Sequence, residues 1–517
     1  MTNDSMIKTR IQLKLEHDEE KKVDFTQISS LSDNSEKEEN YIDDLTFNDL
    51  NLKNIFKKID KTFTTPGQEV LYHMLRRPLI DKEKLEARKK IIDSFEKNQK
   101  ASDDVAETLF KLDKTFANSK SILWSEFQDS ELLSVVSKAL AITPIIWIIL
   151  GIVLMAPSYA FLFFANLIVN SILNMKIENA LMGRTKIAGY LAETIKTAER
   201  IADLNLEFLG DYNSNLKELT KSCRGVKRAG RLLTKIIKFN ELLDIFNNIF
   251  VLEVNCYFVI MKQLKSRKEE LRQIYYIVGE IDTILSISNF RKMQSNISDP
   301  MFVEEKYLKM TDMVHPLIKE PISNNVVLDN HGIMITGSNM SGKSTFLRTV
   351  GINALLAQTI LTTFSKEYKG SIFYISSSIS PEDSIVEGKS YYLGEAEGIL
   401  RIVNKSKLKV PTLAMIDEIF RGTNPVERIS AAANISNYLV ENNALPLIAT
   451  HDLELTKMVN NFKFFYLKED VKDGGMTFDY KLREGISPTR NAIKLLKMLG
   501  YPKIIIDTTE EQIKHYK

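Results

Sequence analysis

The stretch GIMITGSNMSGKST, residues 332–345, decides the fold of the C-terminal part of this 517-residue chain. The apolar run 333–335 predicts a buried strand, and the apolar positions that recur from Phe346 onward predict a helix. Between them, residues 337–344 match the phosphate-binding loop (P-loop) pattern G-x-x-x-x-G-K-[ST]. A chance glycine-rich turn is the alternative, but a strand before the loop and a helix after it are the context that the pattern requires.

The residue types in this loop suit phosphate groups. Gly337 and Gly342 allow tight turns that point successive backbone N–H groups at phosphate oxygens, and the N-terminus of the following helix adds partial positive charge. Lys343 can reach the β- and γ-phosphates of a nucleotide, and the Ser344 hydroxyl can bind Mg²⁺. The predicted nucleotide-binding residues are Gly337, Ser338, Asn339, Met340, Ser341, Gly342, Lys343, Ser344 and Thr345.

Two further apolar runs end in polar residues that suit nucleotide hydrolysis. The run 412–416 is followed by Asp417, which is placed to hold Mg²⁺, and by Glu418, which can take a proton from an attacking water. A third predicted strand, 445–449, precedes His451, which can sense or polarise the γ-phosphate. Solvated turn acids and a structural histidine are the alternatives for these residues.

These segments together resemble the MutS family of mismatch-repair ATPases, a branch of the ABC-type ATPase fold. The matching stretches are TGSNMSGKSTFLRTVG (336–351), MIDEIFRGTNP (415–425) and ATHDLELT (449–456). The resemblance implies ATP as the nucleotide, Mg²⁺ as its metal and a homodimer as the active form. Residues 387–400 are similar to the family's signature segment, in which Ser390 would contact the γ-phosphate bound by the partner subunit. Residues 485–502 are similar to the family's helical dimerisation region.

The resemblance extends toward the N-terminus and predicts a fold class, namely a C-terminal α/β P-loop ABC-type ATPase domain preceded by an all-α region. The predicted domains are an acidic, mostly disordered tail (1–45), a MutS-like helical core (46–135), an apolar hairpin (136–178), long lever-type helices (179–300) and the ATPase domain with its dimerisation helices (301–517). In the family, a preceding domain with a Phe-x-Glu wedge reads mismatches. With the core starting near residue 46, we expect this chain to lack that domain.

Composition excludes little by itself. The chain has 69 Lys and Arg and 67 Asp and Glu, so its net charge of +2 points to no particular partner. Cys223 and Cys256 are its two cysteines, which argues against a disulfide framework and for a reducing compartment. The first residues are charged and contain no secretory hydrophobic segment, so no cleavable signal peptide is expected.

An apolar segment interrupts the helical region. The 37 residues between Lys138 and Lys176 carry no charge. Split at residues 156–158, they form two helices of about 18 residues, each just long enough to cross a hydrocarbon core of about 30 Å. The sequence therefore predicts a transmembrane hairpin that contacts lipid through residues 139–175 and leaves the ATPase domain in the cytoplasm. The alternative is a hairpin buried in the protein or its dimer interface, which would make the chain cytoplasmic.

A basic stripe follows on a predicted helix. It consists of Arg224, Arg228, Arg231, Lys235 and Lys238, which recur at helical spacing, and no acid occurs between residues 221 and 238. Such a stripe can contact DNA phosphates or an anionic lipid surface. A solvated helix face is the alternative.

The sequence thus predicts a MutS-like, homodimeric ATPase that binds DNA through backbone contacts, is associated with a membrane and has no mismatch-reading domain. Two competing functions remain open. One is a membrane-bound ABC-type transporter ATPase, although two apolar helices are too few to line a solute pathway. The other is a membrane scaffold whose ATP cycle drives contacts with proteins instead of DNA.

Overall fold

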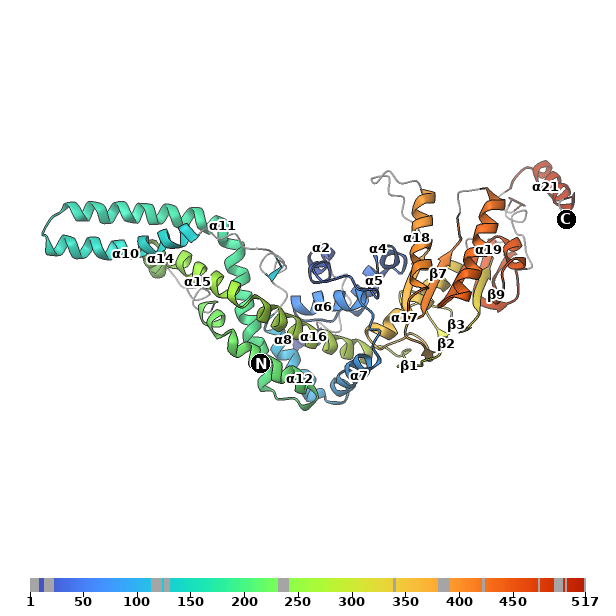
Figure 1. The fold of residues 1–517 in the computed structure, drawn as a ribbon, viewed down its shortest axis with the longest axis horizontal. Coiled ribbons are helices and arrows are strands. Elements are labelled where there is room, and N and C mark those ends of the chain that lie inside the picture. Colours follow the sequence, from blue (N-terminus) through green and yellow to red (C-terminus); the bar gives the residue numbers. More distant parts are fainter. Residues whose placement is uncertain are drawn as a thin grey trace. The chain divides into compact units, whose positions relative to one another are not determined.

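The computed structural model describes residues 9–13, 23–112, 123–124, 131–230, 241–337, 341–379, 391–420, 424–472, 475–487, 496–497 and 500–515. The chain divides into two compact units (Figure 1). Unit 1 consists of Met1–Glu36, Asp60–His73 and Lys90–Phe290, and unit 2 consists of Lys37–Ile59, Met74–Lys89 and Arg291–Lys517. Segments from the first hundred residues therefore belong to both units.

Unit 1 is helical throughout its described residues. Its elements are α2 (Phe25–Ile28), α3 (Ser30–Asp33), most of α6 (Thr65–Arg76), the second half of α7 (Lys82–Lys97), α8 (Gln99–Phe110), α10 (Glu131–Val153), α11 (Ser158–Asp203), η1 (Glu207–Leu209), α12 (Gly210–Ser222), α14 (Glu241–Phe250), α15 (Leu252–Ser266) and most of α16 (Lys268–Lys292). The buried Asp282 of α16 accepts hydrogen bonds from the backbone N–H groups of Phe63 (3.0 Å) and Thr64 (2.8 Å). These bonds satisfy N–H groups that precede α6 and fix its start against α16.

Residues 23–45 are structured, which corrects the prediction of a mostly disordered tail over 1–45. Asp24 caps α2, Asp43 caps α4 (Asp44–Asp49), and the side chains of Ile28, Leu31 and Ile42 are buried. The acidic residues that made this segment look disordered serve partly as helix caps. Its few apolar residues show no sustained period because each short helix buries only one or two of them.

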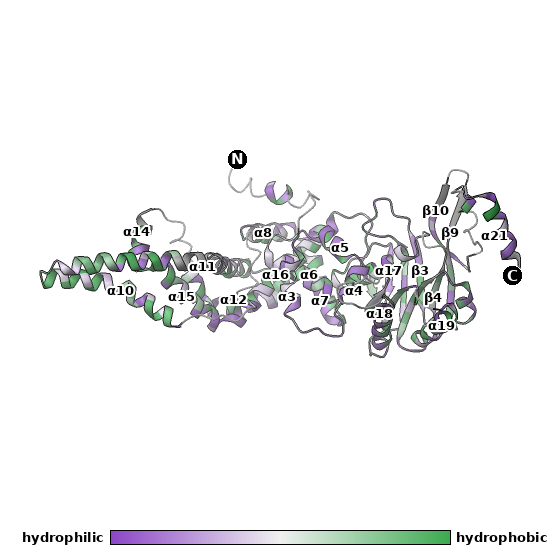
Figure 2. Ribbon diagram, turned by 90° about the horizontal axis from the view of Figure 1, so that it is seen from above, coloured by the Kyte–Doolittle hydropathy of each residue, from purple (hydrophilic) through white to green (hydrophobic). Residues whose placement is uncertain are grey.

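The apolar segment forms two antiparallel helices, α10 and α11, that pack side by side (Figures 1 and 2). The second helix has 46 residues and continues well beyond the predicted span of about 18, since no proline follows its apolar part to end it. Between the two helices, Thr143 Oγ1 donates to Asn166 Oδ1 (2.7 Å), and Asn170 Nδ2 donates to the Leu140 carbonyl (3.2 Å). The polar side chains thus face the helix pair and leave its outer surface apolar.

Unit 2 contains a six-stranded sheet in the order β10-β9-β4-β8-β7-β6, in which β10 is antiparallel to β9 and the other neighbours are parallel. Its strands are β4 (Gly332–Thr336), β6 (Tyr374–Ser378), β7 (Thr412–Asp417), β8 (Ala444–Thr450), β9 (Phe462–Lys472) and β10 (Gly475–Glu484). Strands β4, β6, β7 and β8 are buried at every position, as parallel strands covered on both faces must be.

Helices and a second sheet complete unit 2. The second sheet has the order β1-β5-β2-β3, formed by β1 (Pro300–Phe302), β2 (Tyr307–Met313), β3 (Asn324–Asp329) and β5 (Glu367–Gly370). The helices are α4, α5 (Leu52–Ile59), α17 (Lys343–Thr359), α18 (Tyr391–Lys405), α19 (Pro425–Glu441), η3 (Leu453–Lys457) and α21 (Lys503–His515). A helical N-terminal part followed by a mixed α/β C-terminal part agrees with the predicted fold class at this level.

Candidate nucleotide site

The loop between β4 and α17 has the geometry that its glycines predict. Gly337 and Gly342 have φ angles of 145° and 98°, which side-chain-bearing residues rarely adopt. A Cβ at Gly337 would lie 2.9 Å from Ser341 Oγ, and one at Gly342 would lie 3.0 Å from a ring carbon of Tyr480. Both positions therefore require glycine for backbone conformation and for space. Ser338, Asn339 and Met340 of the predicted loop lie outside the described residues.

Two side chains of the loop, those of Lys343 and Ser344, have defined hydrogen-bond partners. The ammonium group of Lys343, a residue only 2% exposed, donates to the Gly337 carbonyl at 2.7 Å. The Ser344 hydroxyl donates to Oδ2 of Asp417, the last residue of β7. A hydroxyl and a carboxylate are the hard oxygen ligands that Mg²⁺ prefers, so this pair fits the predicted metal. The two predicted metal ligands, 73 positions apart in the chain, are thus neighbours.

The predicted general base and the predicted phosphate sensor contact each other. Nδ1 of His451 lies 2.8 Å from Oε1 of Glu418, because β7 and β8 are adjacent parallel strands that end at the same edge. The hydrogen bond to Glu418 and the charge of this carboxylate raise the pKa of His451, against the opposing effect of partial burial. Glu418 has a φ of 64°, a strained conformation for a residue with a side chain and one that clusters at functional sites.

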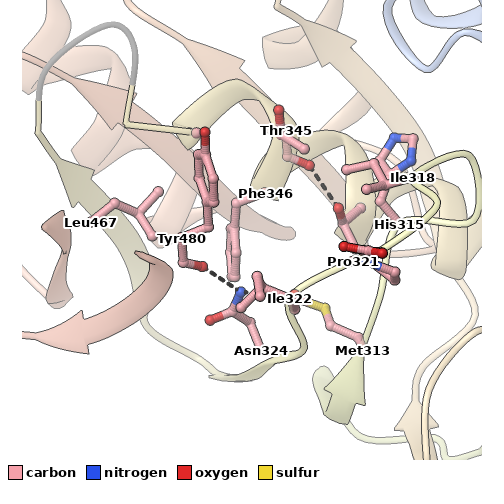
Figure 3. A pocket seen from close by; sticks show the side chains of 13 residues that line it. Met313, His315, Ile318, Pro321, Ile322, Asn324, Thr345, Phe346, Leu467 and Tyr480 are labelled. Carbon is pink, nitrogen blue, oxygen red and sulfur yellow. Dashed lines mark hydrogen bonds between the residues drawn. The ribbon is translucent and has the colours of Figure 1, made fainter. Parts of the chain in front are cut away.

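A cavity of about 320 Å³ adjoins the loop (Figure 3). Gly342, Thr345 and Phe346 line it from the loop side, and Ile322 and Tyr480 line it from the β2–β3 connection and from β10. Sequence reasoning missed the last two residues, which belong to no motif and lie far from the loop in the chain. Hydrogen bonds between the start of β3 and β10 bring them together; among these, Asn324 Nδ2 donates to the Tyr480 carbonyl (2.9 Å).

His315 lines the same cavity without adding positive charge at neutral pH. Burial, together with the nearby charges of Arg348 and Lys58, lowers its pKa to about 4. Apart from Glu320, the side chains that line the cavity are neutral and mostly apolar, and Gly342 places the cavity beside the phosphate loop. This environment suits a flat, uncharged heterocycle more than a charged group.

Several predicted functional residues fall outside what the structure describes. Ser390 lies just before α18, in the undescribed stretch 380–390, and Arg231, Lys235 and Lys238 of the basic stripe lie within 231–240. The stripe's described members, Arg224 and Arg228, are exposed. Part of the predicted dimerisation region, 488–495 and 498–499, is likewise undescribed.

Fold and site define a class of protein with a helical N-terminal part and a mixed α/β C-terminal part that carries a phosphate-loop sequence. Sequence profiles identify both parts. The profile of MutS domain III matches residues 36–288, and that of MutS domain V matches residues 333–517. The chain belongs to the MutS family.

Individual relatives agree with this assignment. The DNA mismatch repair protein MutS of Thermotoga maritima is 27% identical over 356 residues, which are 65% of this chain and 42% of the relative. MutS of Clostridium novyi is 25% identical over 510 residues, 88% of this chain and 56% of the relative. MutS of Clostridium botulinum (strain Loch Maree) is 28% identical over 357 residues, 66% of this chain and 37% of the relative. The chain thus spans roughly half or less of the length of these curated relatives.

Proposed function

We propose that this chain is a MutS-like ATPase with an ABC-type ATPase domain in unit 2, and that it binds ATP at the loop between β4 and α17. The observation that carries the proposal is the contact of Ser344 with Asp417, beside a lysine that is held inside a glycine loop. Phosphate oxygens would replace the Gly337 carbonyl as acceptors for Lys343. The cavity that Ile322 and Tyr480 help to line would take the adenine base.

Hydrolysis follows from the placement of Glu418. Mg²⁺, held by Ser344 and Asp417, would neutralise charge that develops on the phosphate oxygens. Glu418 accepts the proton of the attacking water. His451 holds the carboxylate of Glu418 in one orientation through its 2.8 Å contact. Ser390 would complete the γ-phosphate site of a partner subunit, so the active form is a homodimer.

The test of this mechanism is Glu418→Gln. The variant keeps the metal ligands and loses the base, so it should bind ATP like the wild type and hydrolyse it about 10²- to 10⁴-fold more slowly. Glu427→Gln, at an exposed acid in the first turn of α19, is the matched control and should turn over normally. A Glu418→Gln enzyme with wild-type turnover would assign the base to another residue.

We also infer that the hairpin of α10 and α11 anchors the chain in a membrane. Only 11% of the apolar window in α10 and 17% of that in α11 are buried. The exposed apolar side chains of α10 include Ile145, Ile146, Ile148, Ile149 and Ile152, which recur at helical spacing and form one broad apolar face. Helix α11 exposes a similar face through Phe161, Phe164 and Ile168, so both helices of the pair present apolar surface that lipid would cover. Figure 2 shows hydrophobic residues, in green, along much of the paired helices α10 and α11.

Polar groups in the hairpin support lipid as its surroundings. Thr143 and Asn166 satisfy each other between the helices, as hydrocarbon requires. Near the turn, the rings of Trp147 and Tyr159 stack with centroids 6.3 Å apart, and such aromatic residues are typical of a membrane interface. A hairpin returns to the side it left, which keeps the ATPase domain in the cytoplasm. Wild-type protein should sediment with membranes and need detergent for extraction; solubility without detergent would refute the anchor.

DNA is the proposed partner, bound through phosphates by the lever helices and the basic stripe. A membrane-bound ATPase that acts on proteins instead of DNA is the second candidate, and the apolar hairpin favours it. DNA binding by the detergent-solubilised dimer, measured at several salt concentrations, separates the two. No binding at low salt would favour the protein-directed function.

A further inference from the structure

Helix α14 (Glu241–Phe250) is held against the hairpin by two asparagine side chains of α11. Asn170 Nδ2 donates to the Ile249 carbonyl at 2.7 Å, and Asn174 Nδ2 donates to the Asn247 carbonyl at 3.1 Å. Both carbonyls belong to the last turn of α14, where backbone oxygens have no partner within the helix. The two asparagines are only 0% and 7% exposed. These contacts therefore fix the position of α14 along α11.

This position is at one end of the apolar hairpin. The apolar part of α11 comprises residues 158–175, so Asn170 and Asn174 lie in its last two turns. Asn170 Nδ2 also donates to the carbonyl of Leu140, which comes two residues after Lys138, at the start of the uncharged run. In a hairpin that crosses a membrane, the ends of the apolar helices lie at the bilayer surface. The last turn of α14 is thus level with the surface at which the hairpin enters.

Within residues 245–250, α14 exposes apolar side chains and bonds a polar one to the hairpin. Ile245 and Phe246 are 57% and 49% exposed. The ring of Phe250, one turn further on, stacks on that of Phe246 with centroids 6.3 Å apart. Asn248 Oδ1, by contrast, accepts a hydrogen bond from Asn174 Nδ2 (3.3 Å). A helix on the surface of a water-soluble domain has the opposite arrangement, with its apolar stripe packed inward.

We propose that α14 is an interfacial membrane helix, and that Ile245 and Phe246 lie between the lipid headgroups and the acyl chains. The inference rests on the proposed membrane anchor. Lipid is the occupant because this face continues the apolar surface of the hairpin, in which the exposed Val169 and Ile172 flank the contacts of α11 with α14. Aromatic side chains are typical of this depth in a membrane. Helix α14 gives the anchor a third contact with the bilayer and sets how deeply the hairpin enters.

The experiment measures the depth of position 246 in the full chain reconstituted into phosphatidylcholine liposomes. The two native tryptophans, Trp124 and Trp147, are replaced by phenylalanine, and Phe246→Trp supplies a single reporter. An interfacial helix buries its apolar face about 5–10 Å below the headgroups. Lipid brominated near the headgroup end of its acyl chains should therefore reduce the emission more than lipid brominated near the chain ends.

Lys217→Trp in the same background is the matched control. Lys217 is exposed on α12, and its ammonium group contacts Asn205 (3.3 Å), just past the end of α11. That end lies about 40 Å along the helix from its apolar part. Neither brominated lipid should reduce the emission of this variant. Ile245→Trp, a second reporter on the exposed face of α14, should behave like Phe246→Trp and serves if that variant does not fold.

A third chain separates failure of this inference from failure of the anchor. It carries Trp124→Phe alone, so that Trp147 of α10 reports on the hairpin. If Trp147 is quenched by brominated lipid while the reporters at 245 and 246 are not, the anchor stands and the assignment of α14 is overturned. Blue-shifted but unquenched emission at 246 would overturn it as well, since protein, such as a second copy of this chain, would then cover the face. If Trp147 is not quenched either, the membrane anchor itself fails.

Discussion

The phosphate-loop region buries charged side chains, whereas the apolar hairpin exposes apolar ones. Each is the opposite of the usual arrangement in a folded protein. Lys343 and Asp417 are charged but only 2% and 8% exposed, whereas Ile152 and Met155 are apolar but 71% and 90% exposed. Each buried charge has a hydrogen-bond partner that a ligand atom could replace. The exposed apolar surface can lower its free energy only by leaving water. The first region is therefore suited to a small polar ligand and the second to a continuous apolar phase.

The largest effect is expected in the hairpin. Ile148→Lys combined with Phe164→Lys places charges at two exposed apolar positions, each of which costs roughly 3 kcal/mol in the middle of a membrane helix. The double variant should shift from the membrane to the soluble fraction. Val426→Lys, at an exposed valine of unit 2, should leave the distribution unchanged. If the double variant stayed in the membrane fraction, we would conclude that Ile148 and Phe164 contact protein and not lipid.

The next effect is expected at the phosphate loop. Lys343→Ala removes a unit charge whose contact with a phosphate at 4 Å is worth about 4 kcal/mol at an effective dielectric constant of about 20. Equilibrium binding of ATP should therefore weaken by about three orders of magnitude. Lys366→Ala, at an exposed lysine of the same unit, is the control. A folded Lys343→Ala variant with normal ATP affinity would contradict the assignment of the loop.

A smaller effect is expected on DNA binding. Neutralising Arg224 and Arg228 together should reduce the slope of log affinity against log salt by up to about 2. Neutralising Lys217 and Lys262, two exposed lysines of unit 1, is the control for net charge. Phosphate contacts carry no base information, so matched and mismatched duplexes should bind alike. A large mismatch preference at near-physiological salt would reveal a base-reading element.

The smallest effect concerns His451. The pKa of His451 is raised in the folded state. Its ion pair with Glu418 therefore stabilises the fold fully at pH values below the ordinary histidine pKa of about 6.5. This stabilisation is lost as the pH rises through the raised pKa of the folded state. His451 is nearly half exposed, which limits the contribution to about 1 kcal/mol. The free energies of unfolding of the wild type and of His451→Gln, measured by chemical denaturation, should therefore differ at pH 5.5 and become equal at high pH. Equal stabilities at pH 5.5 would contradict the pair.

Local patterns were sufficient for the parts whose geometry depends on neighbouring residues. The glycines at 337 and 342 predict the loop because only a glycine backbone adopts those φ angles with the space available. The charge-free run between Lys138 and Lys176 predicts paired helices because its length and its central proline leave few other arrangements. Asp417 was predictable because a carboxylate at the end of a buried parallel strand lies at the edge where α/β proteins bind ligands.

Tertiary structure decided what depends on pairing between distant segments. Tyr480 and Ile322 meet beside the phosphate loop through contacts that no local period encodes. His451 contacts Glu418 because β7 and β8 are paired in register. Residues 23–45 looked disordered because their caps and few apolar side chains find partners only in the folded chain. Sequence determines which backbone conformations are accessible locally, whereas sheet register and burial, summed over the whole chain, determine which side chains meet.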